Sequence, residues 1–333
     1  MALRDVKVTI DLVKATGRVG MGIPLILSQN AETEVEFTEV TSLSEVIAAG
    51  FDNTTNTYKA ANLIFMQDDA PAKIAVCATS NSATDWLLKE GNVAKDWRQL
   101  IVVDGSVDHA TLMTLIETLR GKMYFASLPV DYSTTLKIEG LERTVLFYCT
   151  DEDYAGVEVA AVVGATAGYD AGSFTYKNII LKGIKAQDLS LAQVNAIHEK
   201  GGFTCVKKAG DIVTTEGKVC GGEYIDIVDS KDYVIADIEY NGQKLLNNNK
   251  KIPYDNVGIA MIESVVVSCL KRAYNMGIVA NNEDGTPAYS VSTLTRTEVD
   301  AGDRANRIYR GCNFSFGLAG AIHEALVQGE ILV

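Results

Sequence analysis

The stretch IAVCATSNSATDWLLKEGNVAKDWRQLIVV, residues 74–103, contains the pattern that decides the fold class. It begins and ends with short apolar runs, 74–78 and 100–103, which are typical of strands buried on both faces. Between them, Ser82 and Asp85 precede an apolar segment in the arrangement of a helix N-terminus. A strand, a helix and a second strand in this order favour a parallel sheet covered by helices.

The same alternation continues on both sides of this stretch. Asp108 precedes an amphipathic helix that ends at Gly121, and Ser42 with Glu45 forms a capping box before another helix. The predicted α/β domain spans residues 23–175. Its further strands are predicted at 23–27, 123–126 and 145–148, and a last helix at 151–163 is followed by the small residues 164–168.

A different order of elements follows this domain. Ser190 and Gln193 form a capping box before a short helix, and Asp255 precedes a long helix that reaches Asn275. The long helix is apolar around most of its circumference, so it belongs in a core or a broad interface. The predicted fold class is therefore α/β (α+β) with two packed domains, the second spanning 176–310. Strands are predicted at 178–181, 203–206, 212–215 and 224–228, and a helix at 232–246.

The N-terminus has the two-residue period of a half-buried strand. We predict an extended N-terminal arm over residues 1–22, in which the glycines form flexible joints. The apolar side chains that share one face of this strand are Val6, Val8, Ile10 and Leu12, and the joint residues are Gly17, Gly20 and Gly22.

The C-terminus, residues 311–333, is predicted as a second strand arm. Phe314 and Phe316 alternate with polar residues and are predicted to anchor it, with Gly317 and Gly320 as its joints. A further strand-like run ends the sequence. The side chains that share its outgoing face are Val327, Ile331 and Val333.

Strand-like ends pose a hydrogen-bonding problem, because an isolated strand leaves backbone N–H and C=O groups unpaired. Either the two ends pair within the chain's own sheet, or they join the sheet of a neighbouring copy by β-augmentation. The residues alone leave both alternatives open.

The bulk composition limits the function classes. With 43 acidic and 30 basic residues the formal net charge is −13, a balance that repels phosphate backbones and disfavours nucleic-acid binding. The six cysteines include no C-x-x-C pair and mostly lie in apolar runs, which predicts synthesis in a reducing cytoplasm. The sequence has neither a signal-peptide pattern nor a run of about 18 apolar residues, so we expect no membrane span.

A search for catalytic chemistry finds no convergent set of reactive groups. None of His109, His198 and His323 belongs to an H-E-x-x-H motif, and each is interpreted as a surface histidine. The glycine-rich residues 163–168 lack the lysine and hydroxyl residue of a phosphate loop, and no G-x-S-x-G motif occurs. We therefore expect no catalytic residue, no cofactor and no metal, and the protein is predicted not to be an enzyme.

Five segments carry a family resemblance. They are YDAGSFTYK at 169–177, FTCV at 203–206, GGEYIDIVD at 221–229, KIPYDNVGI at 251–259 and the closing residues 320–333. In this order they resemble the conserved domain and the C-terminal arm of contractile phage tail-sheath proteins. The sequence departs from the family at Ala171, where the family has proline, and the likeness is weaker over residues 1–168.

This resemblance implies a structural role. Family members form a helical homo-oligomer of stacked rings around an inner tube, and contraction drives the tube through a target envelope. The implied partners are further copies of the chain, an inner tail-tube protein, and baseplate and tail terminator proteins, without direct contact to nucleic acid or membrane. The implied location is a phage tail or a released phage-tail-like bacteriocin particle, after synthesis in the bacterial host cytoplasm.

Two other functions remain as alternatives. One is a self-assembling tube or shell protein that does not contract. The other is an α/β enzyme acting on a small molecule, which predicts one deep pocket lined by titratable groups with perturbed pKa values.

Overall fold

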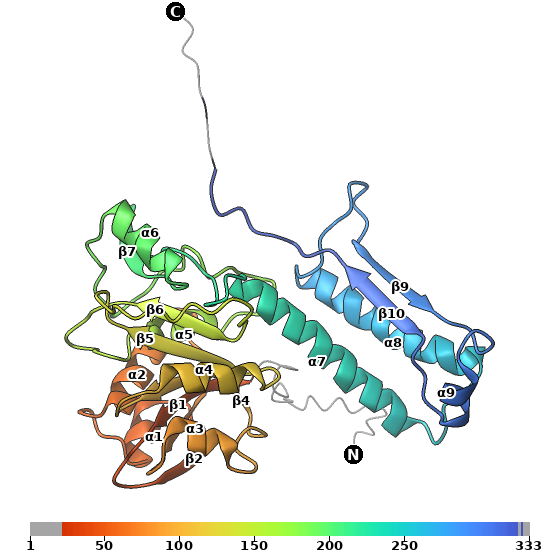
Figure 1. The fold of residues 1–333 in the computed structure, drawn as a ribbon, viewed down its shortest axis with the longest axis horizontal. Coiled ribbons are helices and arrows are strands. Elements are labelled where there is room, and N and C mark those ends of the chain that lie inside the picture. The colour runs from red at the N-terminus through yellow and green to blue at the C-terminus, as the bar shows by residue number, and fades with distance from the viewer. Residues whose placement is uncertain (1–21, 326–327, 329–333) are drawn as a thin grey trace, which may run out of the picture.

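The computed structural model describes residues 22–325 and residue 328. A body built on one β-sheet occupies one end of the molecule, and a long helix leads from it to a projecting second part (Figure 1). Several predicted arm and joint residues lie outside the described residues, namely Val6, Val8, Ile10, Leu12, Gly17, Gly20, Val327, Ile331 and Val333.

The body contains a six-stranded sheet in the order β2-β3-β1-β4-β5-β6. Its strands are β1 (Ile23–Ser28), β2 (Val35–Val40), β3 (Ile74–Ala78), β4 (Trp97–Val103), β5 (Met123–Leu128) and β6 (Thr144–Tyr148). The edge strand β2 is antiparallel to β3, whereas the other five strands run parallel. The central strand β1 pairs with β3 on one side and with β4 on the other. Its Leu27 lies opposite Cys77 of β3 and Val102 of β4. The predicted largely parallel sheet is confirmed.

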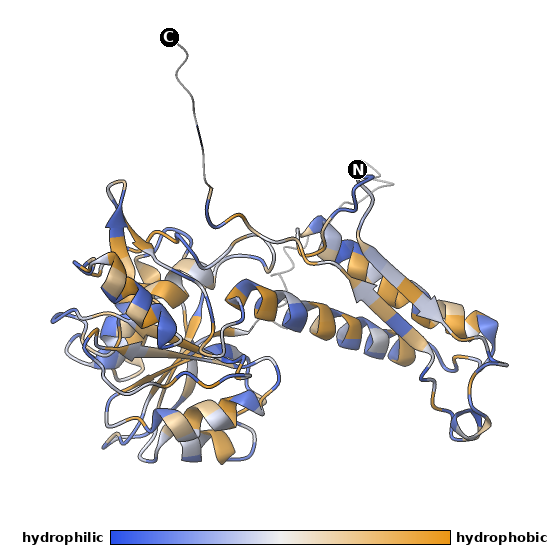
Figure 2. Cartoon of the chain, turned by 45° about the horizontal axis from the view of Figure 1, so that its top comes forward, coloured by the Kyte–Doolittle hydropathy of each residue, from blue (hydrophilic) through white to orange (hydrophobic). Residues whose placement is uncertain are grey.

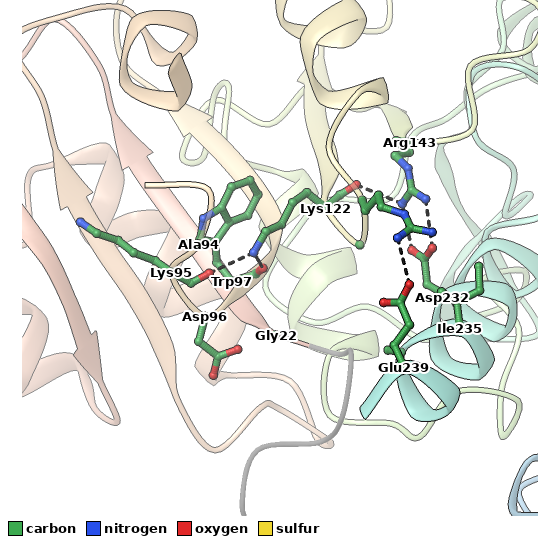
Figure 3. A pocket seen from close by; sticks show the side chains of 13 residues that line it. Gly22, Ala94, Lys95, Asp96, Trp97, Lys122, Arg143, Asp232, Ile235 and Glu239 are labelled. Carbon is green, nitrogen blue, oxygen red and sulfur yellow. Dashed lines mark hydrogen bonds and ion pairs between the residues drawn. The ribbon is translucent and has the colours of Figure 1, made fainter. Parts of the chain in front are cut away.

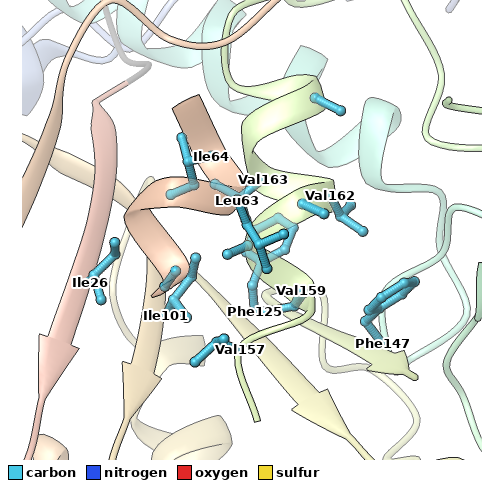
Figure 4. Packing of buried hydrophobic residues seen from close by; sticks show 14 of the residues in the cluster. Ile26, Leu63, Ile64, Ile101, Phe125, Phe147, Val157, Val159, Val162 and Val163 are labelled. Atoms are coloured by element: carbon cyan, nitrogen blue, oxygen red, sulfur yellow. The ribbon is translucent and has the colours of Figure 1, made fainter. Parts of the chain in front are cut away.

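Helices cover both faces of this sheet, as its continuous apolar strands predict. They are α1 (Leu43–Ala48), α2 (Asn56–Phe65) and α5 (Val159–Thr166) on one face, and α3 (Ala83–Leu88) and α4 (His109–Glu117) on the other. Neighbouring strand residues serve opposite faces: Ile26 packs under α2 and α5, whereas Leu25 packs against α3 and α4. Figure 4 shows the first cluster, with Leu63 and Val163 facing the sheet.

Polar N-cap residues precede the helices at the predicted positions. The side chains of Ser42, Ser82 and Asp108 each accept a hydrogen bond from the backbone N–H three residues further on. Such a cap stabilises a helix by about 1 kcal/mol. Thr55 caps α2 in the same way. Neither this cap nor its helix was predicted.

The last helix of the body begins later than predicted. Residues 151–158 form turns, and α5 occupies 159–166, so part of the small-residue segment continues the helix instead of ending it. Close packing accounts for the glycine within it. A Cβ at Gly164 would lie 2.6 Å from the Cα of Ile64, so only glycine lets α5 approach α2 this closely.

The segment after α5 adds a small layer to the same body. The helix α6 (Leu191–Glu199) begins with the predicted capping box at Ser190, and β7 (Cys205–Lys208) pairs antiparallel with β8 (Asp211–Thr214). Both strands therefore lie within a few residues of their predicted positions. The predicted strand at 178–181 is wrong, because only an isolated bridge between Ile180 and Val213 forms there.

This layer shares its core with the sheet. Phe203 packs edge-on against Phe147 of β6 with 5.6 Å between the ring centroids, and both rings are fully buried. Cys205 and Val219 belong to the same cluster. Residues on both sides of the predicted boundary at 175 are thus packed together, and the boundary itself stays a prediction.

The helix α7 (Ile225–Asn248) connects the body to the projecting part. Residues 224–228 were predicted as a strand, and this prediction is wrong. Their alternating pattern is outweighed by a helical one, since Ile225, Val228 and Asp232 recur every three to four residues and are all buried. The helix therefore begins seven residues before the predicted start at 232.

We call α8 (Asn256–Asn275), β9 (Tyr289–Thr293), α9 (Ala301–Ala305) and β10 (Cys312–Phe316) the C-terminal module. Asp255 caps α8 as predicted, accepting hydrogen bonds from the N–H groups of Val257 and Gly258. The strands β9 and β10 pair antiparallel and lie on α8, which packs in turn against α7 (Figure 1). Val234, Val266 and Leu270 form the centre of this small core.

Candidate inter-subunit surface

The two-stranded sheet of the C-terminal module has one apolar and one polar face. Cys312, Phe314 and Phe316 alternate along β10 and point to one side, where Phe316 packs into the core over α8. On the opposite side the hydroxyl oxygens of Ser290 and Ser315 lie 2.9 Å apart in a hydrogen bond. Figure 2 shows the corresponding bands of apolar and polar residues along α7 and α8.

Phe314 is incompletely covered by the rest of the module. Its ring is stacked on that of Phe316 with 6.4 Å between centroids, yet 42% of the residue remains exposed. The structure therefore brings the two predicted anchor residues together on one face. Their role in binding a neighbour stays a prediction.

Both outer edges of this sheet are open along most of their length. Among the described residues, β9 and β10 have each other as their partners. Beyond the pair, two isolated bridges at one end, Val279 with Leu318 and Asn281 with Pro287, continue the ladder. An open edge presents a row of unpaired N–H and C=O groups that an extended segment of another chain can bind. A two-stranded sheet is also marginal by itself, so an added strand would stabilise it.

The three predicted joint glycines within the described residues differ in their surroundings. Gly22 lies where a Cβ would be 2.5 Å from the carbonyl carbon of Trp97, so close packing requires glycine there. Gly317 is held by hydrogen bonds to Ala280 and Ala288. Nothing lies within 4 Å of a Cβ at Gly320. Their function as joints stays a prediction.

The segment that follows β10 turns back to the body at His323. The imidazole Nε2 lies 2.8 Å from the Oγ1 atom of Thr175, and the ring meets that of Tyr224 edge-on at 5.0 Å. Only 15% of the side chain is exposed. The interpretation of His323 as a surface histidine is therefore wrong, because Thr175 and Tyr224, both distant in the sequence, cover its ring.

A buried ion network fixes α7 to the sheet. Arg98 of β4 donates hydrogen bonds to Asp229 and to Asp232, the latter at 2.8 Å, and Arg143 donates two more to Asp232 at 2.9 and 3.0 Å. The Tyr176 hydroxyl donates to Asp229 at 2.9 Å. Sequence analysis did not identify this network, because its members are scattered over 135 residues.

The charges in this network support one another. Burial alone would lower the pKa of the Arg98 guanidinium, but the charges of Asp229 and Asp232 outweigh burial and raise it. Burial would likewise raise the pKa of Asp232, whereas hydrogen bonds and charge from Arg143 and Arg98 hold it below its usual value. Burial, followed by the charge of Asp229, raises the pKa of Tyr176. Arg98 and Asp232 are therefore both charged at neutral pH, whereas the Tyr176 hydroxyl keeps its proton.

A cavity of about 370 Å³ lies beside the network, between α7 and the end of the sheet where Gly22 enters β1 (Figure 3). Its charged side chains largely engage one another or the backbone. Arg120 pairs with Glu239 at 2.9 Å, and the Lys122 ammonium donates to the carbonyl oxygen of Lys95 at 3.0 Å. Burial lowers the pKa of Lys122 to about 8.

The described residues contain no cluster of three or more His, Cys, Asp or Glu side chains placed to hold a metal ion. Within the same part of the chain, none of the helices combines the length and the apolar character needed to cross a membrane. All six cysteines are free thiols, and five of them are buried, as their positions in apolar runs predict.

Solved structures share this architecture over nearly the whole chain. A chain of the anti-feeding prophage (AFP) helical sheath in its contracted state covers 100% of this chain and 99% of its own length, with a TM-score of 0.69 and 14% identity. The sheath complex of PVC, an extracellular contractile injection system, in its contracted state gives coverages of 99% and 98%, a TM-score of 0.73 and 11% identity. The chain has the tail-sheath fold.

A sheath tail protein from Listeria innocua is similar over 82% of this chain and 88% of its own length, with a TM-score of 0.60 and 11% identity. No protein-family model matches the sequence, and no curated protein matches it either. The tail-sheath fold therefore persists at identities where sequence comparison fails. It includes the sheet body, α7 and the C-terminal module, although the segments that carried the resemblance covered only the second half of the chain.

Proposed function

We propose that this chain is the subunit of a contractile tail sheath, which polymerises as stacked rings around an inner tube and contracts to drive the tube through a target envelope. The observation that carries this proposal is the tail-sheath fold over nearly the full length, shared with two structures of contracted sheaths. A structural subunit has no need of a catalytic residue or a cofactor, and we propose none.

The open sheet of the C-terminal module supports assembly through strand exchange. A strand added to it would form about six ladder hydrogen bonds, each contributing about 1 kcal/mol net, and would bury apolar side chains beside Phe314. The proposed donors are the N-terminal arm strand with Val8 and Ile10 and the C-terminal run with Val327 and Ile331. Such links would hold subunits together while their bodies rotate.

The partners and the location follow from the same proposal. The chain would contact further copies of itself, an inner tail-tube protein, and baseplate and tail terminator proteins. Its net charge of −13 disfavours direct contact with nucleic acid. The subunit would be made in a bacterial cytoplasm and end in a phage tail or a released phage-tail-like particle.

Electron microscopy of the purified protein tests this function. Helical tubes in which the axial length per subunit takes two values, extended and contracted, would support a contractile sheath. Tubes with a single axial length per subunit would support the non-contractile alternative. Deleting residues 1–15 or 320–333 should leave folded subunits that no longer form tubes. Normal tubes from either truncation would contradict the arm assignment.

The enzyme alternative makes a different prediction. It requires a deep pocket with unpaired reactive groups, whereas the charged groups of the cavity beside α7 largely satisfy one another. Monodisperse subunits that never assemble, together with turnover of a small molecule, would favour that alternative.

A further inference from the structure

A tight turn that follows α5 of the body inserts into the C-terminal module. The backbone N–H of Ser173 donates to the carbonyl oxygen of Asp170 at 3.1 Å, which closes a turn over residues 170–173. We call these residues the docking turn. Ala171 within it is only 1% exposed and belongs to the hydrophobic cluster of the module, together with Ile278. The docking turn therefore comes from one part of the molecule and is buried in the other.

The docking turn meets the module where α8 ends. Gly277 closes this helix with a φ of +83°, and the N–H of Ile278 donates back to the carbonyl oxygen of Ala273 at 3.0 Å. Gly172 lies directly on this helix end, since a Cβ there would be 2.5 Å from Cγ1 of Ile278 and 2.9 Å from its backbone nitrogen. Gly172 also has a φ of +79°, which favours glycine. The contact leaves no room for a side chain at this position.

The chain on both sides of the docking turn is fixed in the body. Before it, α5 is buried along its whole length. After it, Tyr176 is 1% exposed, and its hydroxyl donates to Asp229 at 2.9 Å. The carbonyl oxygen of Tyr176 accepts a hydrogen bond from the Thr214 hydroxyl at 2.6 Å. The docking turn is thus a fixed projection of the body.

Two contacts on different elements fix an orientation better than one. The ion network holds the first turns of α7 on the sheet through Asp229 and Asp232. From there α7 leads to the module (Figure 1). A helix held only at its base can tilt about that point and carry the module with it. The docking turn adds a contact at the end of α8, and this second contact opposes such a tilt.

We propose that the docking turn sets the angle between the body and the C-terminal module, with Ala171 and Gly172 as its positioning residues. The module carries the open edges of β9 and β10, so the same angle decides where these edges face a neighbouring copy. Only this last consequence rests on the proposed function. The angle itself is a property of the single subunit.

Distance measurements between two spin labels on the unassembled full-length chain test this angle. Nitroxide labels at Leu88→Cys on α3 and at Leu246→Cys near the end of α7 report the direction of α7 relative to the sheet. Both leucines are more than half exposed, at 67% and 57%. Cys312→Ser removes the partly exposed native thiol from every sample. The chain without further substitutions should give one narrow distance distribution.

Gly172→Ala should shift or broaden this distribution, because the new Cβ is forced against Ile278. Gly210→Ala is the matched control. Gly210 also has a positive φ, +107°, but nothing lies within 4 Å of its Cβ. This control carries a similar backbone strain without the contact and should leave the distribution unchanged. Equal shifts in the two variants would overturn the proposal.

Ile278→Ala tests the same contact from the side of the module, and it decides the question if Gly172→Ala does not fold. It removes the side chain on which the docking turn packs and leaves the backbone of the turn unstrained, so the distribution should broaden. Val266→Ala truncates another side chain of the same core and should leave the distribution unchanged. A distribution for Ile278→Ala that matches the wild-type one would overturn the positioning role.

The outcomes separate this inference from the proposed function. Broadened distributions together with a wild-type chain that never forms tubes would support the positioning role and contradict the sheath function. Wild-type tubes together with unchanged distributions in Gly172→Ala and Ile278→Ala would support the sheath function and overturn the positioning role. If both hold, Gly172→Ala should lower the yield of tubes, whereas Gly210→Ala should not.

Discussion

Arg98 of β4 and Asp232 of α7 are joined by a hydrogen bond of 2.8 Å, in which the guanidinium Nη1 donates to the carboxylate Oδ2. The Arg98 side chain is fully buried and that of Asp232 is 6% exposed. The two residues lie 134 positions apart and belong to the sheet and to the long helix. Their pairing therefore sets the direction in which α7 carries the C-terminal module away from the body.

Replacing Arg98 by methionine should strongly destabilise the protein. Arg98→Met keeps a long side chain but leaves the buried carboxylates of Asp229 and Asp232 without their central cation. Removing one partner of a buried ion pair costs about 3–5 kcal/mol. The free energy of unfolding, measured by denaturant titration at pH 7, should fall by that amount.

The exposed pair between Arg120 and Glu239 provides a matched control. Its N–O distance of 2.9 Å is similar, but the side chains are 79% and 60% exposed. Arg120→Met should therefore change the free energy of unfolding by less than about 1 kcal/mol. Equal effects of the two substitutions would contradict the assignment of the network as the anchor of α7.

The network also predicts how stability depends on pH. Because the pKa of Asp232 is lowered in the folded protein, its stabilising contribution is complete above the unfolded pKa of about 4 and is lost as the pH falls through the folded value. Asp232→Asn should reduce the slope of unfolding free energy against pH below pH 4 by up to about 1.4 kcal/mol per pH unit. Denaturant titrations between pH 2.5 and 7 measure it, and identical slopes would be inconsistent with this prediction.

The sheet of the body could be predicted from local patterns. Continuous apolar runs such as 74–78 and 145–148 identified buried parallel strands, and polar residues such as Ser82 identified where helices begin. These signals lie within a few residues of one another, so no knowledge of tertiary contacts is needed to interpret them.

Tertiary contacts explain the errors and omissions. Residues 224–228 alternate like a strand, yet burial of Asp229 and Asp232 against Arg98 makes them the first turns of α7. The edge strand β2 was not predicted, because an exposed antiparallel edge carries a weak hydrophobic pattern. His323 could not be identified as a contact residue because Thr175 is 148 positions away.

Gly164 and Gly242, two helical glycines with opposite surroundings, give a paired test of helix packing. Gly164→Ala should destabilise the protein by about 1–3 kcal/mol, because the new Cβ would lie 2.6 Å from the Cα of Ile64. Gly242→Ala, in α7 with nothing within 4 Å of the Cβ, should stabilise it by about 0.5–1 kcal/mol through better helix propensity. Thermal and denaturant unfolding measure both. Shifts of the same sign would argue against the close α2–α5 contact.

Phe314 gives a test of assembly that is largely independent of folding. With 42% of the residue exposed, Phe314→Ser should lower the free energy of unfolding by only about 1 kcal/mol. If the open sheet of the C-terminal module binds a strand from a neighbouring copy, the substitution removes a large apolar contact from the centre of that interface, and tubes should fail to form. Leu88→Ser is the control, because Leu88 is 67% exposed on α3 of the body, away from that sheet. Electron microscopy and light scattering measure assembly. Tubes from both variants in equal yield would mean that the exposed face at Phe314 is not the interface, whereas loss of tubes in Phe314→Ser alone would support strand exchange there.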